Sequence, residues 1–327
     1  MAVDYSNWMK NTLPIIGGQP LKNVSMSASH DAGMSSVSNC GIGANACNTQ
    51  TQTKTILGQL QSGTRYFDIR PVIYKGVMYT GHLDESTGIG CNGESLQSVL
   101  NDVSTFIARS GDLVLLKFSH YFDRDHGITG TSGFTSAQMT TLVNMVSSSL
   151  QRYLFSQPTK SGQGDLSGFT MNQYIGQRGV VLTVYDQLPS NLWNSRTGVY
   201  AYADKGGAGD LIVYDQYSKT NDLNTMVTDQ LAKLENPGNH GINLFLLSWT
   251  LTLSASQAIA CAATPQTTQI VNLAQSAKQV LQQNIQTAYY AKQITSTIMP
   301  NLLYTDACDS SITDTAIWLN QQLYGAN

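Results

Sequence analysis

Short runs of apolar and β-branched residues alternate along this chain with longer stretches in which apolar residues recur at helical spacing. The short runs predict strands at residues 24–29, 64–70, 77–81, 113–120, 179–185, 211–217, 243–252 and 301–305. The longer stretches predict helices at residues 53–61, 95–109, 136–154, 223–234, 266–295 and 313–323. Residues 155–168, rich in Ser, Gly and Gln, predict a long surface loop.

The stretch 95–109 illustrates the helical pattern. Its apolar residues are spaced three or four apart, so they share one face of a helix, and Ser95 can cap the first turn. The apolar residues are Leu96, Val99, Leu100, Val103, Phe106 and Ile107.

Strands that alternate with helices pair in parallel through right-handed crossovers. About eight strands with no dominant linker favour one α/β barrel of the (β/α)8 TIM type, so we expect residues 1–327 to form a single domain. A doubly wound open sheet is the rival arrangement. Residues 241–277 carry no charge, but their polar residues and Pro265 favour a strand, a loop and a helix over a membrane span.

Composition narrows the class of protein. Hydrophobic residues make up 41% of the chain, which allows a sizeable core, whereas charged residues make up only 12%. The average soluble protein has about 25% charged residues, and the polar, weakly charged balance here leans towards a secreted protein. No signal peptide is visible at the start of the sequence. The formal net charge of -3 and scattered basic residues argue against a nucleic-acid partner.

The chain has five cysteines, so at least one thiol stays unpaired within a monomer. Cys40 and Cys47, separated by a Gly/Asn-rich stretch, are candidates to staple a loop. Five reduced, mostly buried cysteines are the alternative. No Cys-x2-Cys pair is present, which leaves a structural zinc site with little support.

Three polar clusters follow predicted strands, which is where α/β barrels place their active sites. They are residues 29–33 (SHDAG), 66–71 (YFDIRP) and 81–82 (GH). His30 and His82 can serve as acid and base near neutral pH, and Arg70 can neutralise phosphoryl oxygens. This combination suits cleavage of a phosphodiester. Taken singly, each of these residues is more often structural.

The same runs resemble the X-type catalytic domain of phosphatidylinositol-specific phospholipases C, in its bacterial, metal-independent form. Residues 29–33, 63–71 (GTRYFDIRP) and 81–82 carry the resemblance. Residues 112–120 (DLVLLKFSH) and 302–306 (LLYTD) continue it, so it spans about residues 20–320. The resemblance implies an irregular, incompletely closed barrel.

The resemblance also implies a two-step reaction. The inositol 2-hydroxyl attacks phosphorus to give a cyclic phosphate and diacylglycerol, and water then opens the ring slowly. By position, His30 is similar to the general base oriented by Asp306, and His82 to the general acid supported by Asp31. Arg70 is similar to the phosphate clamp.

Four further residues fall where the resemblance implies contact with the substrate. Lys117, Asp215 and Tyr217 match positions that touch the inositol ring, and Asp68 joins this substrate-binding set. The expected partner is phosphatidylinositol or a related inositol phosphodiester, with room for transient contact with a membrane surface. We expect a monomer.

The motif also bears on metal dependence. Calcium-using members of the family carry Asn after the first histidine and Glu-x-Asp on the second strand, all oxygen ligands for a hard cation. Here Asp31 follows His30, and Arg70 replaces the second acid, so we expect neither a metal nor a cofactor. The sequence departs from the bacterial pattern in two places. No basic residue lies in 179–185, and no Trp lies in 32–53.

Other patterns suggest alternatives that we rank lower. Gly88-x-Gly90-x-x-Gly93 resembles a dinucleotide fingerprint, but we expect it in a long polar loop. His120 with residues 123–126 (DRDH) reads as a solvated loop rather than a metal cluster, with His120 near the site mouth. A glycerophosphodiesterase-type barrel and a non-catalytic binding barrel are the competing functions. Arg70 argues against the first, and the paired histidines with their acids argue against the second.

Overall fold

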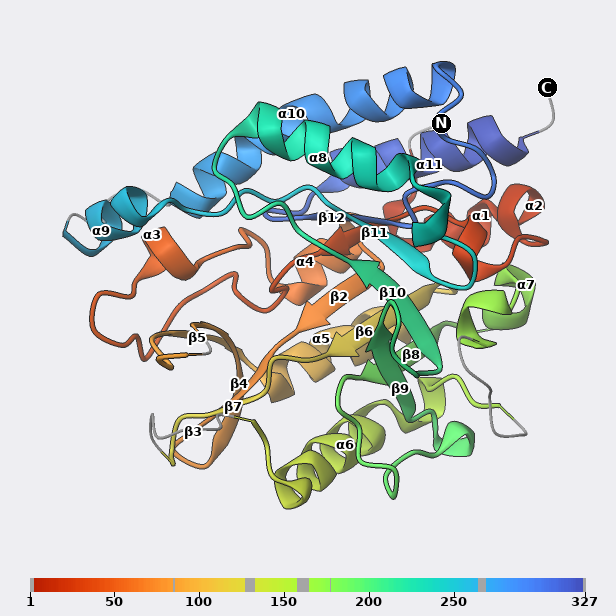
Figure 1. The fold of residues 1–327 in the computed structure, drawn as a ribbon. Helices are drawn as coiled ribbons and strands as arrows, with labels where there is room; N and C mark the ends of the chain where they lie inside the picture. Colours follow the sequence, from red (N-terminus) through yellow and green to blue (C-terminus); the bar gives the residue numbers. More distant parts are fainter. Residues whose placement is uncertain are drawn as a thin grey trace.

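Eight parallel strands form the centre of the molecule (Figure 1). The computed structural model describes residues 3–84, 86–126, 133–157, 165–176, 178–263 and 269–325. In ring order the barrel strands are β1 (Met26–Ser29), β12 (Leu302–Thr305), β11 (Leu244–Ser248), β10 (Leu211–Asp215), β9 (Tyr200–Asp204), β8 (Val180–Tyr185), β6 (Leu113–Phe118) and β2 (Tyr66–Ile69). The predicted (β/α)8 barrel is confirmed. The prediction that the barrel is incompletely closed was wrong. β1 pairs with β12 and also with β2, where Ala28 lies opposite Tyr66, so the ring of strands is closed.

Six helices match the predicted ones, with ends shifted by a few residues. They are α4 (Ile56–Gln61), α5 (Leu96–Ile107), α6 (Ser136–Leu150), α8 (Leu223–Glu235), α10 (Gln269–Tyr290) and α11 (Ser310–Tyr324). Residues 266–268 of the predicted helix 266–295 and residues 158–164 of the predicted loop lie outside the described residues. The structure also has helices that were not predicted: α1 (Trp8–Asn11), α2 (Leu13–Ile16), α3 (Ala46–Thr49), α7 (Met171–Tyr174) and α9 (Ala255–Ala263).

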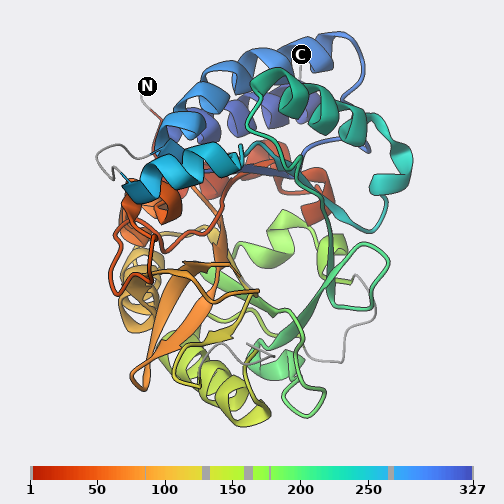
Figure 2. The ribbon, with the colours of Figure 1, turned by 60° about the vertical axis from the view of Figure 1, so that its left-hand side comes forward.

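The helices cover two opposite sides of the barrel. Figure 2 looks obliquely at the ring, with the blue C-terminal helices on one side and the yellow-green segment of α6 on the other. Helix α5 has its six apolar residues buried, and Ser95 caps it by accepting from the Ser98 amide, as the spacing predicted. No helix in the described part of the chain is long and apolar enough to span a membrane.

A second sheet of four strands lies beside the barrel, in the order β5-β4-β3-β7. Its strands are β3 (Pro71–Tyr74), β4 (Val77–Leu83), β5 (Gly90–Ser95) and β7 (Phe122–Asp123). The prediction that His82 follows a barrel strand was wrong. His82 lies within β4, which pairs antiparallel with both neighbours and places His82 opposite Cys91. The stretch from Gly90 to Gly93 is likewise part of β5 rather than a polar loop.

The N-terminal segment closes the end of the barrel at which the strands begin. The Trp8 indole donates to the Gly63 carbonyl, and the Asp112 carboxylate accepts from the amides of Met9 and Lys10. Asp112 also pairs with Arg65 at 2.8 Å, and both side chains are fully buried. Because a buried ion pair needs further hydrogen bonds to offset desolvation, these amide contacts tie the N-terminal helices to the barrel.

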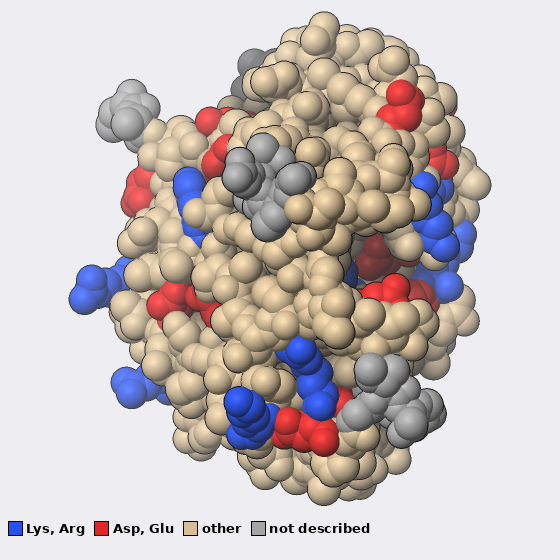
Figure 3. All heavy atoms as spheres, turned by 90° about the vertical axis from the view of Figure 1, so that its left-hand side faces the viewer, with Lys and Arg blue, Asp and Glu red and all other residues tan. Residues whose placement is uncertain are grey.

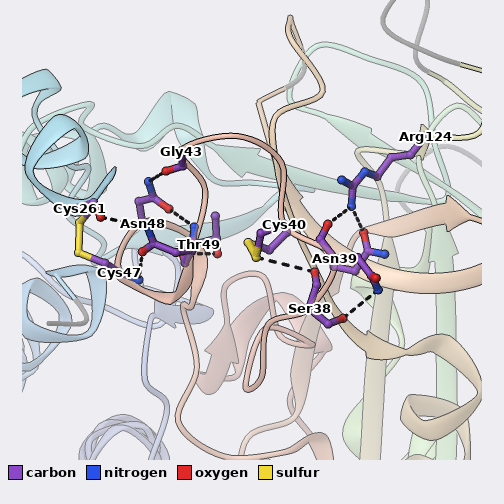
Figure 4. Close-up of a disulfide and its surroundings, with 12 residues drawn as sticks. Ser38, Asn39, Cys40, Gly43, Cys47, Asn48, Thr49, Arg124 and Cys261 are labelled. Carbon is purple, nitrogen blue, oxygen red and sulfur yellow. Dashed lines mark hydrogen bonds between the residues drawn. A yellow bond between two sulfur atoms is a disulfide. The ribbon is translucent and has the colours of Figure 1, made fainter. Parts of the chain in front are cut away.

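Two disulfides hold the segment of residues 38–49 between the second sheet and α9 (Figure 4). Cys40 bonds Cys91 on β5, and Cys47 bonds Cys261 on α9, so the predicted Cys40–Cys47 staple was wrong. Arg124 adds a hydrogen bond to the Asn39 carbonyl. The remaining cysteine, Cys308, is a buried free thiol, as the odd count required.

The two disulfides are expected to contribute unequally to stability. They join residues separated by 51 and 214 positions, and the chain-entropy account assigns the longer loop more stabilisation, by about 1 kcal/mol. We expect Cys47→Ser/Cys261→Ser to lower the free energy of unfolding by about 4–5 kcal/mol, and Cys40→Ser/Cys91→Ser by less. Urea unfolding of both double variants measures this difference. A larger loss from Cys40→Ser/Cys91→Ser would contradict it.

Candidate active site

A cavity of about 1230 Å³ opens at the end of the barrel where the strands finish. Figure 3 faces this side of the molecule and shows a hollow with acidic residues in and beside it. The sequence-predicted residues that line the cavity are His30, Arg70, His82, Lys117, Asp215, Tyr217 and Asp306. Asp31 and Asp68 lie directly behind them, buried against Arg70. The structure therefore brings all nine predicted residues to one place.

His30 follows β1 and is held by a carboxylate from the neighbouring strand. Its Nδ1 lies 2.7 Å from Asp306 Oδ1, just after β12. A carboxylate accepts the Nδ1 proton, which leaves Nε2 of the neutral ring with a lone pair. Burial opposes charge on this ring, but Asp306 outweighs burial and raises the pKa of His30.

Asp31 connects His82 to Arg70. Its Oδ2 lies 2.9 Å from His82 Nδ1, and its Oδ1 lies 2.8 Å from Arg70 Nε. Both contacts are close in distance but lie off the axis of a hydrogen bond. Burial favours the neutral acid, yet Arg70 and His82 together lower the pKa of Asp31. The carboxylate is thus kept ionised between Arg70 and His82.

Arg70 lies where the chain leaves β2 and enters β3. Its Nε donates to Asp68 Oδ2 at 2.9 Å, which anchors the guanidinium from behind. Among the described residues, neither Nη of Arg70 donates a hydrogen bond. Burial disfavours the charge, but Asp31 and Asp68 hold the pKa of Arg70 well above its usual value. The four Nη protons are therefore available to an anion in the cavity.

Asp68 is the buried acceptor at the base of the site. It accepts from the Tyr304 hydroxyl at 2.7 Å and from Ser119 at 3.2 Å, in addition to Arg70. Burial would favour the neutral acid, but Arg70 and then Lys117 hold the pKa of Asp68 well below its usual range. Asp68 therefore holds Arg70 and Lys117 in place from behind, with its own carboxylate fully buried.

Lys117 on β6 marks the side of the cavity away from the histidines. Its Nζ lies 3.5 Å from Asp68 and 3.6 Å from Asp215, and 4.8 Å from the ring centroid of Tyr202. Burial disfavours its charge, but the two carboxylates raise the pKa of Lys117. Tyr217 is about half exposed, at 49%, on the rim of the same side.

Four residues, each the second after the end of a barrel strand, adopt left-handed backbone angles. Asp31 has φ 43°, His120 φ 53°, Gln187 φ 50° and Ala307 φ 47°. Such angles cost free energy in residues with a Cβ and concentrate where structure serves a site. The sharp turns direct the preceding or following side chains into the cavity.

Sequence reasoning missed several residues that line the cavity, among them Tyr304, Tyr202, Asp186 and Asp204. Asp186 follows the predicted strand 179–185, so its position could have identified it. Asp204 could not be identified in this way, because β9 was not predicted from the sequence. His120 lines the cavity mouth as expected. The positive charge of Arg70, followed by burial, lowers the pKa of His120 to about 3, so this ring is neutral. In the described part of the chain, no group of His, Cys, Asp and Glu is placed to hold a metal ion.

The sequence matches no protein-family model and no curated protein sequence. Solved structures do match. A variant of the phosphatidylinositol-specific phospholipase C of Staphylococcus aureus aligns with TM-score 0.62 and 15% identity, over 96% of this chain and 97% of that one. The phosphatidylinositol-specific phospholipase C of Listeria monocytogenes aligns with TM-score 0.60 and 17% identity, over 97% and 98%.

The chain has the phospholipase C barrel fold of these bacterial proteins. The alignment covers almost the whole chain. At 15–17% identity the likeness establishes the phospholipase C fold alone, so the activity has to be argued from the side chains.

Proposed function

We propose that this chain is a phosphodiesterase of the phosphatidylinositol-specific phospholipase C type. The observation that carries the proposal is the arrangement of two histidines, each backed by a carboxylate, around the free Nη groups of Arg70. The ring centroids of His30 and His82 lie 6.4 Å apart, so both rings can contact one phosphate. An activated nucleophile, a protonated leaving group and a fixed positive charge are the three requirements of the reaction.

In the first step the inositol 2-hydroxyl attacks phosphorus and gives its proton to His30 Nε2. The new O–P bond closes a cyclic phosphate as the bond to the diacylglycerol oxygen breaks. Protonated His82 gives its proton to that oxygen, which leaves as an alcohol. Arg70 neutralises charge on the non-bridging oxygens, and Asp306 stabilises the imidazolium that forms at His30.

The direct test is product analysis. Phosphatidylinositol and a soluble inositol phosphodiester are incubated with the protein, and the products are followed by phosphorus NMR. We expect a cyclic inositol phosphate to appear first and an open monophosphate to follow slowly. An open monophosphate that forms without a cyclic intermediate would refute the intramolecular mechanism.

We propose that the reaction needs no metal ion. Arg70 supplies a permanent positive charge, and Asp31 and Asp68 are already paired with it. Activity in excess EDTA is therefore expected to equal activity without it. A loss that added calcium restores would contradict this proposal.

The Asp306 carboxylate is expected to set the acid limb of the pH–rate profile. His30 must be neutral to act as a base, so activity rises as pH increases through its pKa, which Asp306 raises. In Asp306→Asn the acid limb should move to lower pH, and the maximal rate should fall at least about tenfold. The control is Asp309→Asn, because Asp309 pairs with Lys278 outside the cavity. An acid limb that does not move would contradict the role of Asp306.

The wider setting follows from the same features. Two disulfides suit an oxidising compartment, so we propose that the protein is secreted. We propose that residues 1–327 act as one catalytic domain and as a monomer, with phosphatidylinositol or a related inositol phosphodiester as the substrate. Lys117, Asp215 and Tyr217 would contact the ring hydroxyls, and the cavity mouth would touch a membrane surface transiently.

A further inference from the structure

The side of the cavity opposite the histidines is lined by more acids than bases. Asp186 follows β8, Asp204 ends β9 and Asp215 ends β10, and all three line the cavity with Lys117. We call the three acids the acidic wall. Electrostatic influence links its members, because Asp204 raises the pKa of both Asp186 and Asp215 after burial has raised it.

Lys117 cannot balance this wall. Its ammonium is already shared between Asp68 and Asp215, which lie 3.5 and 3.6 Å away. In the part of the chain that the structure describes, neither Asp186 nor Asp204 has a Lys or Arg within ion-pair distance. Among the described residues, the Gln187 backbone amide donates to Asp186 and the Tyr202 hydroxyl donates to Asp204.

A buried hydroxyl beneath the acidic wall points to an occupant. Tyr66 on β2 is fully buried, and its hydroxyl has no hydrogen-bond partner among the described residues. The Tyr66 ring lies 6.4 Å from the ring of Tyr304, which lines the cavity, so Tyr66 lies next to the cavity floor. After burial, the acids that raise the pKa of Tyr66 are Asp68, Asp215 and Asp204. Buried hydroxyls are normally satisfied, and a polar molecule in this part of the cavity would satisfy Tyr66 directly or through water.

The strand that leads to Asp186 lacks any compensating charge. β8 reads Val-Val-Leu-Thr-Val-Tyr, and the first residue after it is Asp186 itself. The next strand, β9, also ends in an acid, Asp204. Two neighbouring strands thus present carboxylates where a neutral polyol would need only hydrogen bonds.

We infer that the acidic wall recognises an ammonium group on the substrate's headgroup, so that the preferred substrate is a phosphodiester of an amine-bearing polyol. The inference rests on the proposed function for the phosphate end of the cavity, where Arg70 binds the anion. The cavity of about 1230 Å³ exceeds the usual range for small-ligand pockets, about 300–1,000 Å³, which leaves room for a substituent beyond one phosphate and one ring. The ammonium would replace water between Asp186 and Asp204 and offset their mutual repulsion.

The test compares binding of neutral and amine-bearing polyols to the whole protein. The ligands are myo-inositol and a panel of aminodeoxy-inositols, each with an ammonium in place of one ring hydroxyl, measured by titration calorimetry or NMR at pH 7. At least one panel member is expected to bind the wild type about tenfold more tightly than myo-inositol, and added salt should reduce this ratio.

Matched variants assign the preference to the acidic wall. In Asp186→Asn/Asp204→Asn the ratio should fall to about one, while binding of myo-inositol stays within a factor of about three. Asp84→Asn is the control, because Asp84 lines the same cavity from β4's side and its substitution removes one of the two negative charges that the double variant loses. Its ratio should stay near the wild-type value.

Three results would overturn the inference: equal binding of all ligands, no binding of any panel member, or a preference that survives in the double variant. The outcome is separable from that of the proposed function, because binding needs no turnover. A wild type that forms a cyclic phosphate without an ammonium preference would overturn the inference alone. A wild type that prefers the amine but cleaves no inositol phosphodiester would overturn the proposed function alone.

Discussion

His30→Ala and His82→Ala are each expected to lower the rate of cyclic phosphate formation by about 10²–10⁴-fold, the usual contribution of a positioned acid or base. The two losses should differ in kind. His82 is proposed to protonate the leaving oxygen, so His82→Ala should recover most of its rate on a phosphodiester with an acidic phenol as the leaving group. His30→Ala should not recover, because the nucleophile still needs a base.

The comparison uses parallel assays of phosphatidylinositol and a nitrophenyl inositol phosphate. His126→Ala is the control, since His126 is 81% exposed and pairs with Asp123 away from the cavity. Unchanged turnover in both active-site variants would contradict the proposed mechanism. Equal recovery of both variants on the phenol substrate would end the assignment of separate acid and base roles.

Asp112→Ala is expected to cause the largest loss of stability of any single substitution discussed here, about 3–5 kcal/mol in the free energy of unfolding. The change leaves the Arg65 guanidinium buried without its carboxylate, and it removes the acceptor for the amides of Met9 and Lys10. Urea unfolding followed by tryptophan fluorescence and by circular dichroism measures the effect.

A surface ion pair provides the control for this stability measurement. Lys233 and Asp229 lie 2.6 Å apart on α8 with both side chains partly exposed, so Lys233→Ala should cost no more than about 1 kcal/mol. Equal losses in Asp112→Ala and Lys233→Ala would show that the buried pair does not anchor the N-terminal segment.

The barrel could be predicted from the sequence because most of its strands are continuous apolar runs. β6 and β11 are buried along their whole length, and Lys117 and Ser248 are the polar residues in these otherwise apolar runs. β9 was missed because its Tyr-Ala-Tyr-Ala-Asp run places small alanines between the tyrosines and ends at an exposed acid. The second sheet was missed for a related reason, since β5 consists largely of Gly, Cys, Asn and Ser.

The candidate site could be predicted in part, for those residues whose place follows from the barrel strand they come after. His30 and Arg70 follow barrel strands, so their meeting follows from the barrel. The position of His82 depends instead on the antiparallel pairing of β3 and β4, and the spacing of apolar residues along the sequence does not indicate this pairing. The pairing of His30 with Asp306, 276 residues away, came from the resemblance and agrees with the 2.7 Å contact. The disulfides join loops whose relative placement depends on the finished barrel, so spacing alone suggested the wrong pair.

The pairing of β1 with β12 also has a consequence for synthesis of the chain. Met26 lies opposite Leu302, so the ring cannot close until β12 has left the ribosome. The Cys47–Cys261 bond likewise cannot form until Cys261 has been synthesised. Contacts between such distant residues make folding slow. A nascent chain therefore stays open, with its N-terminal strand unpaired on one edge, until β12 has emerged, and it depends on protection from aggregation during that interval.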